Sequence, residues 1–170
     1  MLGDFDSLKE GVLDKYKEER DIPIREFNPV KDNTDMDLAL QQAIILGSRE
    51  IHILGGTGGR LDHFFSTVQN LKKAWLKHIP AYLVDSKNLI TLPCEKEFVI
   101  DRETQHGTYV SFMPLEEQVT GLTLEGFKYP LDHFTLTNMS GGLGVSNEIL
   151  AEQGRVSYKD GILLMIQSKD

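Results

Sequence analysis

The chain has 170 residues, 40% of them hydrophobic, and a formal charge of −8, which fits one globular domain or two small ones. The negative charge and the lack of a Lys/Arg cluster argue against a nucleic-acid-binding protein, and no apolar run is long enough for a membrane-spanning helix. The single cysteine, Cys94, excludes an internal disulfide and a cysteine zinc site and favours a cytoplasmic protein.

The first half of the chain predicts alternating helices and strands. A capping-box pattern at Ser7 and Glu10 predicts a first helix, and residues 22–27 predict a strand. Thr34 is the predicted cap of a second helix, which Gly47 ends.

Two further strands and a helix complete this half. Residues 51–54 and 81–84 predict strands, and residues 64–77 between them predict a helix. Strands that alternate with helices are typical of a doubly wound, mostly parallel sheet. We therefore expect an α/β domain over residues 1–86.

Asp4 and Asp6 stand two residues apart, directly before the first predicted helix. In an extended backbone their side chains point to the same face, which suits joint binding of a hard cation such as Mg²⁺. The structural alternative is that Asp6 or Ser7 caps the helix.

A second acidic cluster lies at the start of the helix that Thr34 caps. Asp35 and Asp37 fall in its first turn, where carboxylates stabilise the helix dipole without any further function. We interpret Asp37 as structural, whereas Asp35 remains a candidate for a functional site.

A glycine-rich turn follows the strand at 51–54. It contains Gly56, Gly58, Gly59, Arg60 and Asp62. Glycines between a strand and a helix let the backbone approach a ligand, and the amides of a helix N-terminus bind phosphate. The Arg60 fork suits phosphate oxygens, but a carboxylate at Asp62 would repel them unless a divalent cation lies between. The alternative is an ordinary connection in which Asp62 favours the helix dipole.

The second half of the chain is rich in short β-strands separated by turn residues. An Asp160–Gly161 pair predicts a hairpin between the last two strands. We expect an all-β sandwich or open barrel over residues 87–170, joined to the first domain near residues 85–89. The predicted strands are 89–92, 97–100, 108–113, 119–124, 135–138, 155–158 and 162–167.

A glycine-rich segment at 140–148 lies within the β-rich half. Its glycines fit strand bends, and its Ser146 and Asn147 could orient a ligand or form a local turn. We interpret His52, His78 and His106 as surface or packing residues.

Four segments together carry a specific resemblance. In order, the chain contains Gly-Asp-Phe-Asp-Ser-Leu, Lys-Asp-x-Thr-Asp, Gly-Gly-x-Gly-Gly-Arg-x-Asp-His and, in the β-rich half, Ser-Gly-Gly-x-Gly-x-Ser-Asn-Glu. This combination resembles the thiamine pyrophosphokinase family over nearly the whole chain. The resemblance implies transfer of pyrophosphate from ATP to the thiamine hydroxyl, with AMP as the other product.

The resemblance also implies roles for particular residues. Asp4, Asp6 and Asp35 would hold Mg²⁺, with Asp62 beside them among the catalytic residues. The resemblance implies that ATP is bound by Thr34, Gly56, Gly58, Gly59 and Arg60. It also implies that thiamine is bound by Ser146 and Asn147, in a cleft shared by the two subunits of a homodimer.

One departure from the family pattern concerns the N-terminus. The family ordinarily has a strand and an Asp-Gly-Gly segment before the first motif, whereas only Met1 and Leu2 precede that motif here. We therefore expect part of the sheet and of the active site to be missing from this chain.

Two other functions fit part of the pattern. Asp-Phe-Asp-Ser-Leu is similar to the nucleophile motif of haloacid-dehalogenase-like phosphatases, although the β-rich half argues against that fold. A non-catalytic thiamine- or nucleotide-binding module is the second alternative.

Overall fold

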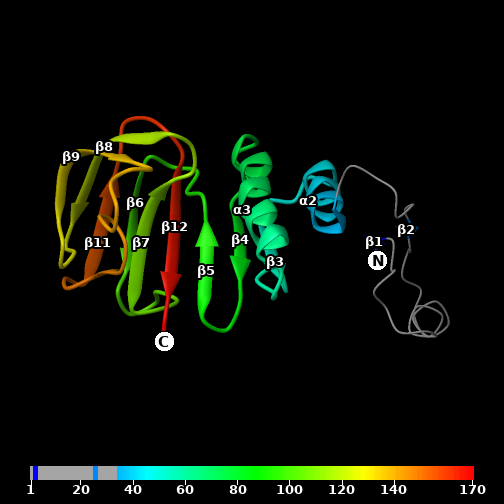
Figure 1. The fold of residues 1–170 in the computed structure, drawn as a ribbon, viewed down its shortest axis with the longest axis horizontal. Helices are drawn as coiled ribbons and strands as arrows, with labels where there is room; N and C mark the ends of the chain where they lie inside the picture. Colours follow the sequence, from blue (N-terminus) through cyan, green and yellow to red (C-terminus); the bar gives the residue numbers. More distant parts are fainter. Residues whose placement is uncertain (1, 4–24, 27–33) are drawn as a thin grey trace. The chain divides into compact units, whose positions relative to one another are not determined.

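The computed structural model describes residues 2–3, 25–26 and 34–170 (Figure 1). The chain divides into two compact units, residues 1–48 and 49–170, each described by itself. The helix predicted after Ser7 and the carboxylates of Asp4 and Asp6 lie outside the described residues.

The first unit contains a short parallel strand pair and one helix. The pair joins β1 (Leu2–Gly3) to β2 (Arg25–Glu26), within the strand predicted at 22–27. Helix α2 spans Asp35–Ile45 and begins as predicted, because the Oγ1 of Thr34 accepts a hydrogen bond from the Asp37 amide at 3.2 Å. It ends before Gly47, whose φ of +74° is a conformation that glycine adopts without strain.

The second unit is built on a six-stranded mixed sheet. Only β3 and β4 run parallel, and every other neighbouring pair is antiparallel. The strand order is β10 (Asn147–Glu148), β7 (Tyr109–Pro114), β12 (Leu163–Ser168), β5 (Asn88–Thr91), β4 (Ala81–Val84) and β3 (Ile51–Leu54).

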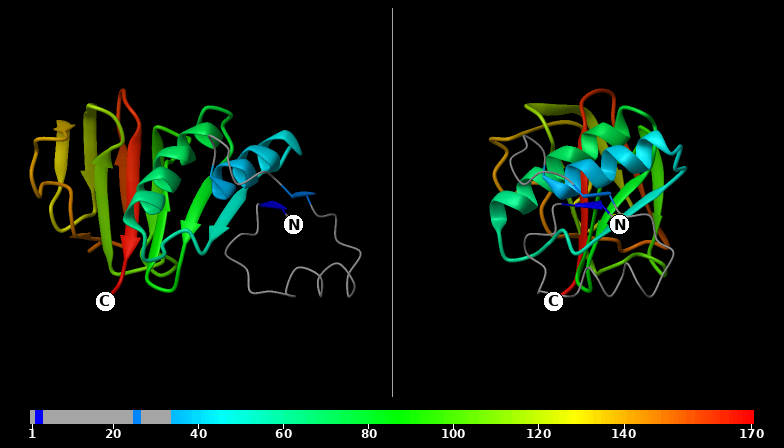
Figure 2. Two further views of the ribbon diagram at one scale, coloured as in Figure 1. Left: turned by 45° about the vertical axis from the view of Figure 1, so that its right-hand side comes forward. Right: turned by 90° about the vertical axis from the view of Figure 1, so that its right-hand side faces the viewer.

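Helix α3 (Leu61–Trp75) covers one face of this sheet at β3 and β4 (Figure 2). Its apolar stripe buries Val68, Leu71 and Ala74. The indole Nε1 of Trp75 donates to the Pro93 carbonyl oxygen at 3.0 Å, which fixes the end of the helix beside the strand-rich part. The helix starts three residues before the predicted Phe64.

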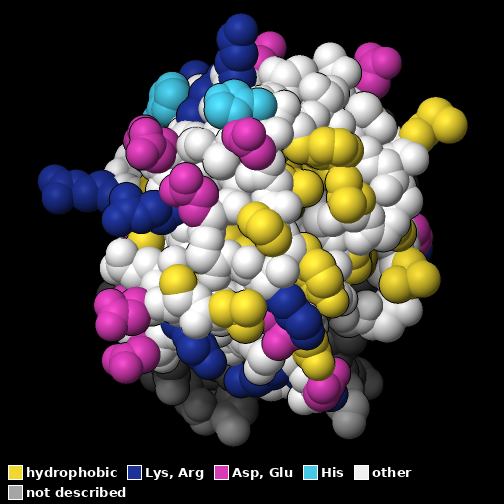
Figure 3. All heavy atoms as spheres, turned by 90° about the vertical axis from the view of Figure 1, so that its left-hand side faces the viewer, with side chains coloured by type: hydrophobic (Ala, Val, Ile, Leu, Met, Phe, Trp, Pro, Cys, Tyr) yellow, Lys and Arg dark blue, Asp and Glu magenta, His cyan; other side chains and the backbone are white. Residues whose placement is uncertain are grey.

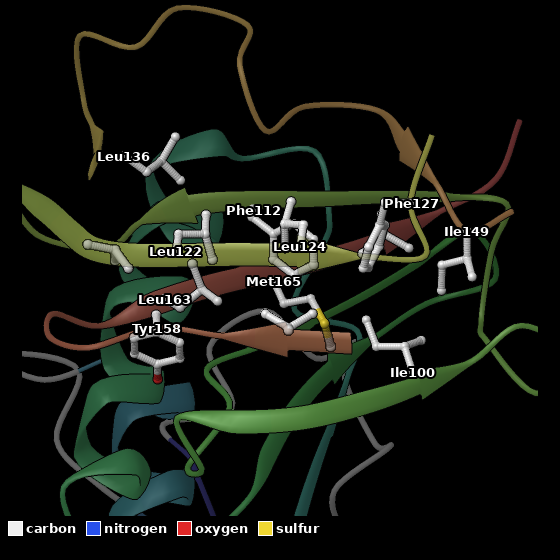
Figure 4. Close-up of a cluster of buried hydrophobic side chains, with 13 residues drawn as sticks. Ile100, Phe112, Leu122, Leu124, Phe127, Leu136, Ile149, Tyr158, Leu163 and Met165 are labelled. Carbon is white, nitrogen blue, oxygen red and sulfur yellow. The ribbon is translucent and has the colours of Figure 1, made fainter. Parts of the chain in front are cut away.

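A four-stranded antiparallel sheet forms the second layer of a sandwich. The main hydrophobic core lies between this sheet and β7 and β12 of the mixed sheet (Figure 4). At its centre the rings of Phe112 and Phe127 pack edge to face, with centroids 5.7 Å apart. The strand order is β6 (Glu97–Asp101), β11 (Gln153–Ser157), β8 (Gln118–Glu125) and β9 (Leu131–Thr137).

The predicted hairpin at Asp160–Gly161 is wrong. The chain does turn there, but β11 belongs to the four-stranded sheet and β12 to the six-stranded sheet. The Asp160 carbonyl instead accepts from the Thr120 amide at 2.9 Å. An Asp-Gly pair favours a tight turn, but it does not specify that the flanking strands pair.

The β-rich half is therefore a sandwich, the first of the two predicted alternatives. The doubly wound sheet is not confirmed, because β4 pairs with β5 and continues into the mixed sheet. The pairing of β4 with β5 crosses the predicted domain boundary between residues 86 and 87. The boundary itself stays a prediction. No helix in the described part of the chain is both long and apolar enough to cross a membrane.

Candidate active site

The glycine-rich turn connects the end of β3 to the start of α3. Arg60 is the N-cap of α3 with an extended backbone, and its side chain makes no capping hydrogen bond. The first intrahelical bond runs from the Phe64 amide to the Arg60 carbonyl at 3.1 Å. Amides in the first turn of a helix have no intrahelical partner, so this helix start can accept an anion.

The three candidate glycines have different surroundings. A Cβ on Gly56 would lie 2.7 Å from Leu83 Cδ1 and 3.3 Å from Ile53 Cγ2, so this glycine lets the turn pack against the sheet. A Cβ on Gly58 or Gly59 would meet no atom within 4 Å. The backbone of these two residues is therefore open to a ligand.

Arg60 and Asp62, both predicted site residues, bind each other. Nη2 of Arg60 lies 2.6 Å from Oδ2 of Asp62, and Nε lies 3.2 Å from Oδ1. The hydrogen bonds from Arg60 lower the pKa of Asp62 to about 2. Both side chains are more than 60% exposed, so the pair remains accessible to a phosphate.

The sequence analysis missed Asp85, which follows β4. Its Oδ1 accepts hydrogen bonds from the amides of Lys87 and Asn88, each at 2.7 Å. A hydrogen bond from the Thr57 side chain is the largest cause that lowers the pKa of Asp85 to about 2. The two amide bonds fix the Asp85 carboxylate within the β4–β5 connection. The pattern Asp85-x-x-Asn88 is typical of an Asx turn and was the available signal.

The remaining acidic candidates belong to the first unit. Asp35 is half-buried in the first turn of α2, and the neighbouring Asp37 is buried. Both make interactions within the protein. Among residues 34–170 no three His, Cys, Asp or Glu side chains converge as a metal site would require.

Ser146 and Asn147 differ in their availability to a ligand. Ser146 is exposed, with a φ of +55°. Asn147 is only 2% exposed: its Nδ2 donates to the Tyr129 carbonyl at 2.8 Å, and its Oδ1 accepts from the amides of Tyr129 and Glu148, each at 3.0 Å. The Asn147 side chain thus holds the backbone around Tyr129 rather than facing solvent.

The surroundings of Ser146 are apolar and exposed. Figure 3 looks onto the side of β8, β9 and β11 and shows hydrophobic side chains gathered on that face. Near Ser146 the exposed residues include Tyr129 and three from the preceding loop: Met139, Leu143 and Val145. An exposed apolar surface of this kind suits an organic substrate or another protein surface.

The glycine turn and Ser146 lie at the same end of the mixed sheet but at opposite edges. The register passes from Leu54 of β3 through the four central strands to Asn147 of β10. Five interstrand spacings of about 4.8 Å separate the two edges by roughly 24 Å.

A separate cavity of about 570 Å³ contains none of the predicted site residues. It lies between the two sheets, beside the start of β4, where Tyr82, Thr91, Cys94 and His106 contribute to its wall. Burial raises the pKa of the Cys94 thiol.

Comparison with known proteins places both halves of the chain. The model of the thiamin pyrophosphokinase catalytic domain matches residues 1–83, and the model of its vitamin B1 binding domain matches residues 96–163. The two matches define a class of transferase in which a catalytic domain is followed by a vitamin B1 binding domain.

A thiamine pyrophosphokinase of Bacillus subtilis (strain 168) is 38% identical over 170 residues, which are 99% of this chain and 78% of that protein. The chain belongs to the thiamine pyrophosphokinase family. The crystal structure of the B. subtilis enzyme superposes with a TM-score of 0.89, at 38% identity and with 99% of this chain and 78% of that chain covered. The enzyme of Geobacillus thermodenitrificans gives a TM-score of 0.85 at 38% identity, with 99% and 76% covered.

Proposed function

We propose that this chain transfers the diphosphate group of ATP to the hydroxyl of thiamine, with the described glycine turn as its phosphate site. The family establishes a thiamine pyrophosphokinase and therefore a diphosphotransferase. The observation that supports the phosphate site is the open start of α3 with the Arg60 fork beside it. Family membership also decides against the phosphatase and the non-catalytic module.

On the ATP side, we assign the phosphate oxygens to Arg60 and to the amides of Gly58 and Gly59. A guanidinium presents two parallel donors, and glycine amides leave room for the phosphate to approach. Gly56 supports this surface by letting the turn pack on β4. In the free protein Asp62 holds the Arg60 guanidinium in place. A bound phosphate would therefore either replace Asp62 as the partner of Arg60 or join the ion pair.

We also propose that Mg²⁺ binds at Asp4, Asp6 and Asp35, with Thr34 setting the start of α2. Carboxylates are the ligands that this hard cation prefers, and the cation would neutralise the polyphosphate charge. Among the described residues no three such side chains converge, and the proposed site therefore includes Asp4 and Asp6. Asp4→Asn or Asp6→Asn should abolish turnover with little change in thermal unfolding, and normal turnover at limiting Mg²⁺ would contradict the assignment.

On the thiamine side, we assign the organic substrate to the surface around Ser146, with Asn147 as its support. The exposed apolar side chains near Ser146 suit the rings of thiamine, and the net charge of −8 suits its cationic ring.

The two substrate surfaces support a homodimer with shared clefts. Reacting atoms must approach to about 3–3.5 Å, yet the two surfaces of one chain lie roughly 24 Å apart across the sheet. A two-fold dimer would bring the glycine turn of one chain to the Ser146 surface of its partner and form two equivalent clefts.

The single free cysteine, Cys94, supports a cytoplasmic location.

Product analysis tests the reaction itself. With ATP, Mg²⁺ and thiamine, the chain should form AMP and thiamine diphosphate in equal amounts. Inorganic phosphate without AMP would indicate a phosphatase, and ATP binding without any product would indicate a binding module.

A further inference from the structure

The cavity of about 570 Å³ in the second unit lies between β4, β5 and β12 of the mixed sheet and β6 of the four-stranded sheet. It continues the main hydrophobic core, because Ile100 and Met165 belong to both (Figure 4). No described residue that we assign to ATP or thiamine lines it. Small-molecule sites typically have volumes of about 300–1,000 Å³, so this cavity is large enough for a ligand of its own.

Hydrogen bonds and close packing hold the wall of this cavity in place. The loop between β6 and β7 is attached to β12, because the His106 amide donates to Oε1 of Gln167 at 2.7 Å. In the same loop a Cβ on Gly107 would lie 2.3 Å from the Ser168 carbonyl oxygen, so glycine is needed for this close approach. On the side of β5, the Thr91 hydroxyl donates to a backbone carbonyl of β4 at 2.8 Å. The cavity is thus preformed, as small-molecule sites usually are.

The lining favours a flat apolar group without negative charge. Phe98 and Met165 contribute a ring and a thioether, and both pack well against an aromatic ring. Glu95 and Asp101 also line the cavity and are exposed, whereas no lysine or arginine among residues 34–170 lines it. Without a fixed positive charge in the wall, these carboxylates attract a cation and repel an anion such as a phosphate. The cavity therefore differs in its chemistry from the proposed phosphate site.

Two polar atoms in the loop between β6 and β7 are shielded from solvent and have no hydrogen-bond partner among the described residues. They are Oε1 of Gln105 and Nε2 of His106, and both side chains belong to residues that line the cavity. A buried acceptor without a donor destabilises the protein. The amide group of glutamine rotates easily about its last side-chain bond, so Gln105 can turn its oxygen toward a donor in the cavity. An N–H group of a ligand would then supply the missing partner.

We propose that this cavity is a second ligand site, for a small aromatic base. The ring of the base packs against Phe98 and Met165, and an N–H group donates to Oε1 of Gln105. The base is neutral or positively charged, because Glu95 and Asp101 are the charged residues of the lining. This site is separate from the proposed ATP and thiamine surfaces and does not depend on the proposed function.

Three probes of the same shape test the charge of the ligand. Benzamidine is cationic, benzamide is neutral and benzoate is anionic, and only benzoate lacks an N–H donor. In calorimetry the Kd of benzamidine should be at least about tenfold lower than that of benzoate, with benzamide between them, because benzamidine combines the donor with a positive charge. Equal affinities for benzamidine and benzoate, or no binding of benzamidine at millimolar concentration, would overturn the proposal.

Cys94 reports whether benzamidine occupies this cavity. It lines the cavity and is the single cysteine of the chain, so alkylation by iodoacetamide adds one group at a known place, which mass spectrometry measures. At about ten times its Kd, benzamidine should slow this alkylation about tenfold, since only the empty fraction of the protein reacts. Benzoate at the same concentration should leave the rate unchanged. A rate that benzamidine does not change would show that the probe binds elsewhere and would overturn the proposal.

Gln105→Met removes the acceptor at nearly constant side-chain length, and it should weaken benzamidine binding about tenfold. Gln118→Met is the matched control, because Gln118 is exposed on β8 and does not line the cavity. The control should bind benzamidine like the wild type. Wild-type affinity in Gln105→Met would overturn the assigned hydrogen bond. If Gln105→Met does not fold, the alkylation of Cys94 in the wild-type chain keeps the test decisive.

Discussion

At the scale of single residues, the ion pair of Arg60 and Asp62 is an exposed part of the candidate site. Exposed pairs contribute little to folding, because solvent already stabilises both charges. The orientation of the pair suits binding: Arg60 presents its guanidinium beside the open start of α3. We therefore expect substitutions here to change ligand affinity rather than stability.

Arg60→Ala should weaken ATP binding at least tenfold, leave thiamine binding nearly unchanged and keep the unfolding temperature, because a charge-assisted phosphate contact is lost. Calorimetry with each substrate measures the effect. Arg102→Ala is the control, since Arg102 is exposed and donates to the Leu150 carbonyl at 3.1 Å in the sandwich. Unchanged ATP affinity in Arg60→Ala would remove Arg60 from the site.

In contrast to Arg60→Ala, the variant Asn147→Ala should reduce the stability of the protein. The variant leaves the backbone groups of Tyr129 without their partners, so it should lower the free energy of unfolding by about 1–3 kcal/mol, measured by urea denaturation. Its thiamine KM should rise through displacement of the Tyr129 and Ser146 backbone, while the ATP KM stays near the wild-type value. A fully stable variant would show that these hydrogen bonds are not needed.

At the scale of elements, the glycine turn has one glycine that packs against the sheet and two that we propose for phosphate binding. Gly56 faces Leu83 and Ile53 of the sheet, whereas Gly58 and Gly59 face open space. Sequence spacing alone does not distinguish the packing glycine from the other two. The atoms that surround a Cβ placed at each glycine do distinguish them.

Gly56→Ala and Gly58→Ala form a matched pair of variants. Gly56→Ala should lower the free energy of unfolding by about 1–3 kcal/mol, because its methyl group overlaps the buried Leu83. Gly58→Ala should unfold like the wild type but bind ATP more weakly, because its methyl group lies where the phosphate approaches. Urea denaturation measures the stability of both variants, and calorimetry measures their ATP affinity. If both variants change in the same way, the proposed difference between Gly56 and Gly58 is wrong.

Local sequence patterns predicted the individual elements well and their pairing poorly. The strands at 51–54 and 81–84 and the Thr34 cap are confirmed, because alternation and capping act between near neighbours. The continuation of β4 into the sheet of β12 and β7 depends on contacts between distant residues. The Asp160–Gly161 hairpin failed for the same reason.

The candidate site shows a similar limit. The sequence indicated Arg60 and Asp62 but could not predict that they bind each other in the free protein. It identified Asn147 but not its burial, and it missed Asp85, whose carboxylate accepts the Lys87 and Asn88 amides after β4. The roles of these residues remain predictions.

At the scale of the whole molecule, the second unit places the two proposed substrate surfaces at opposite edges of one sheet. Four strands separate β3 from β10, which is too far for one chain to join the thiamine hydroxyl to a bound phosphate. The proposed assignment of the two surfaces therefore requires two copies of the chain for each complete site.

Complementation between two variants that are impaired at different edges, assayed at an ATP concentration too low for Arg60→Ala to turn over, tests this requirement directly. One variant, Arg60→Ala, lacks the phosphate contact; the other, Ser146→Lys, places a positive charge where cationic thiamine should bind. If each site combines the two edges of different chains, random mixing gives half mixed dimers with one intact site each, and the mixture should recover about a quarter of the wild-type rate of AMP formation. A mixture no more active than the separate variants would show that each site lies within one chain and would contradict the account.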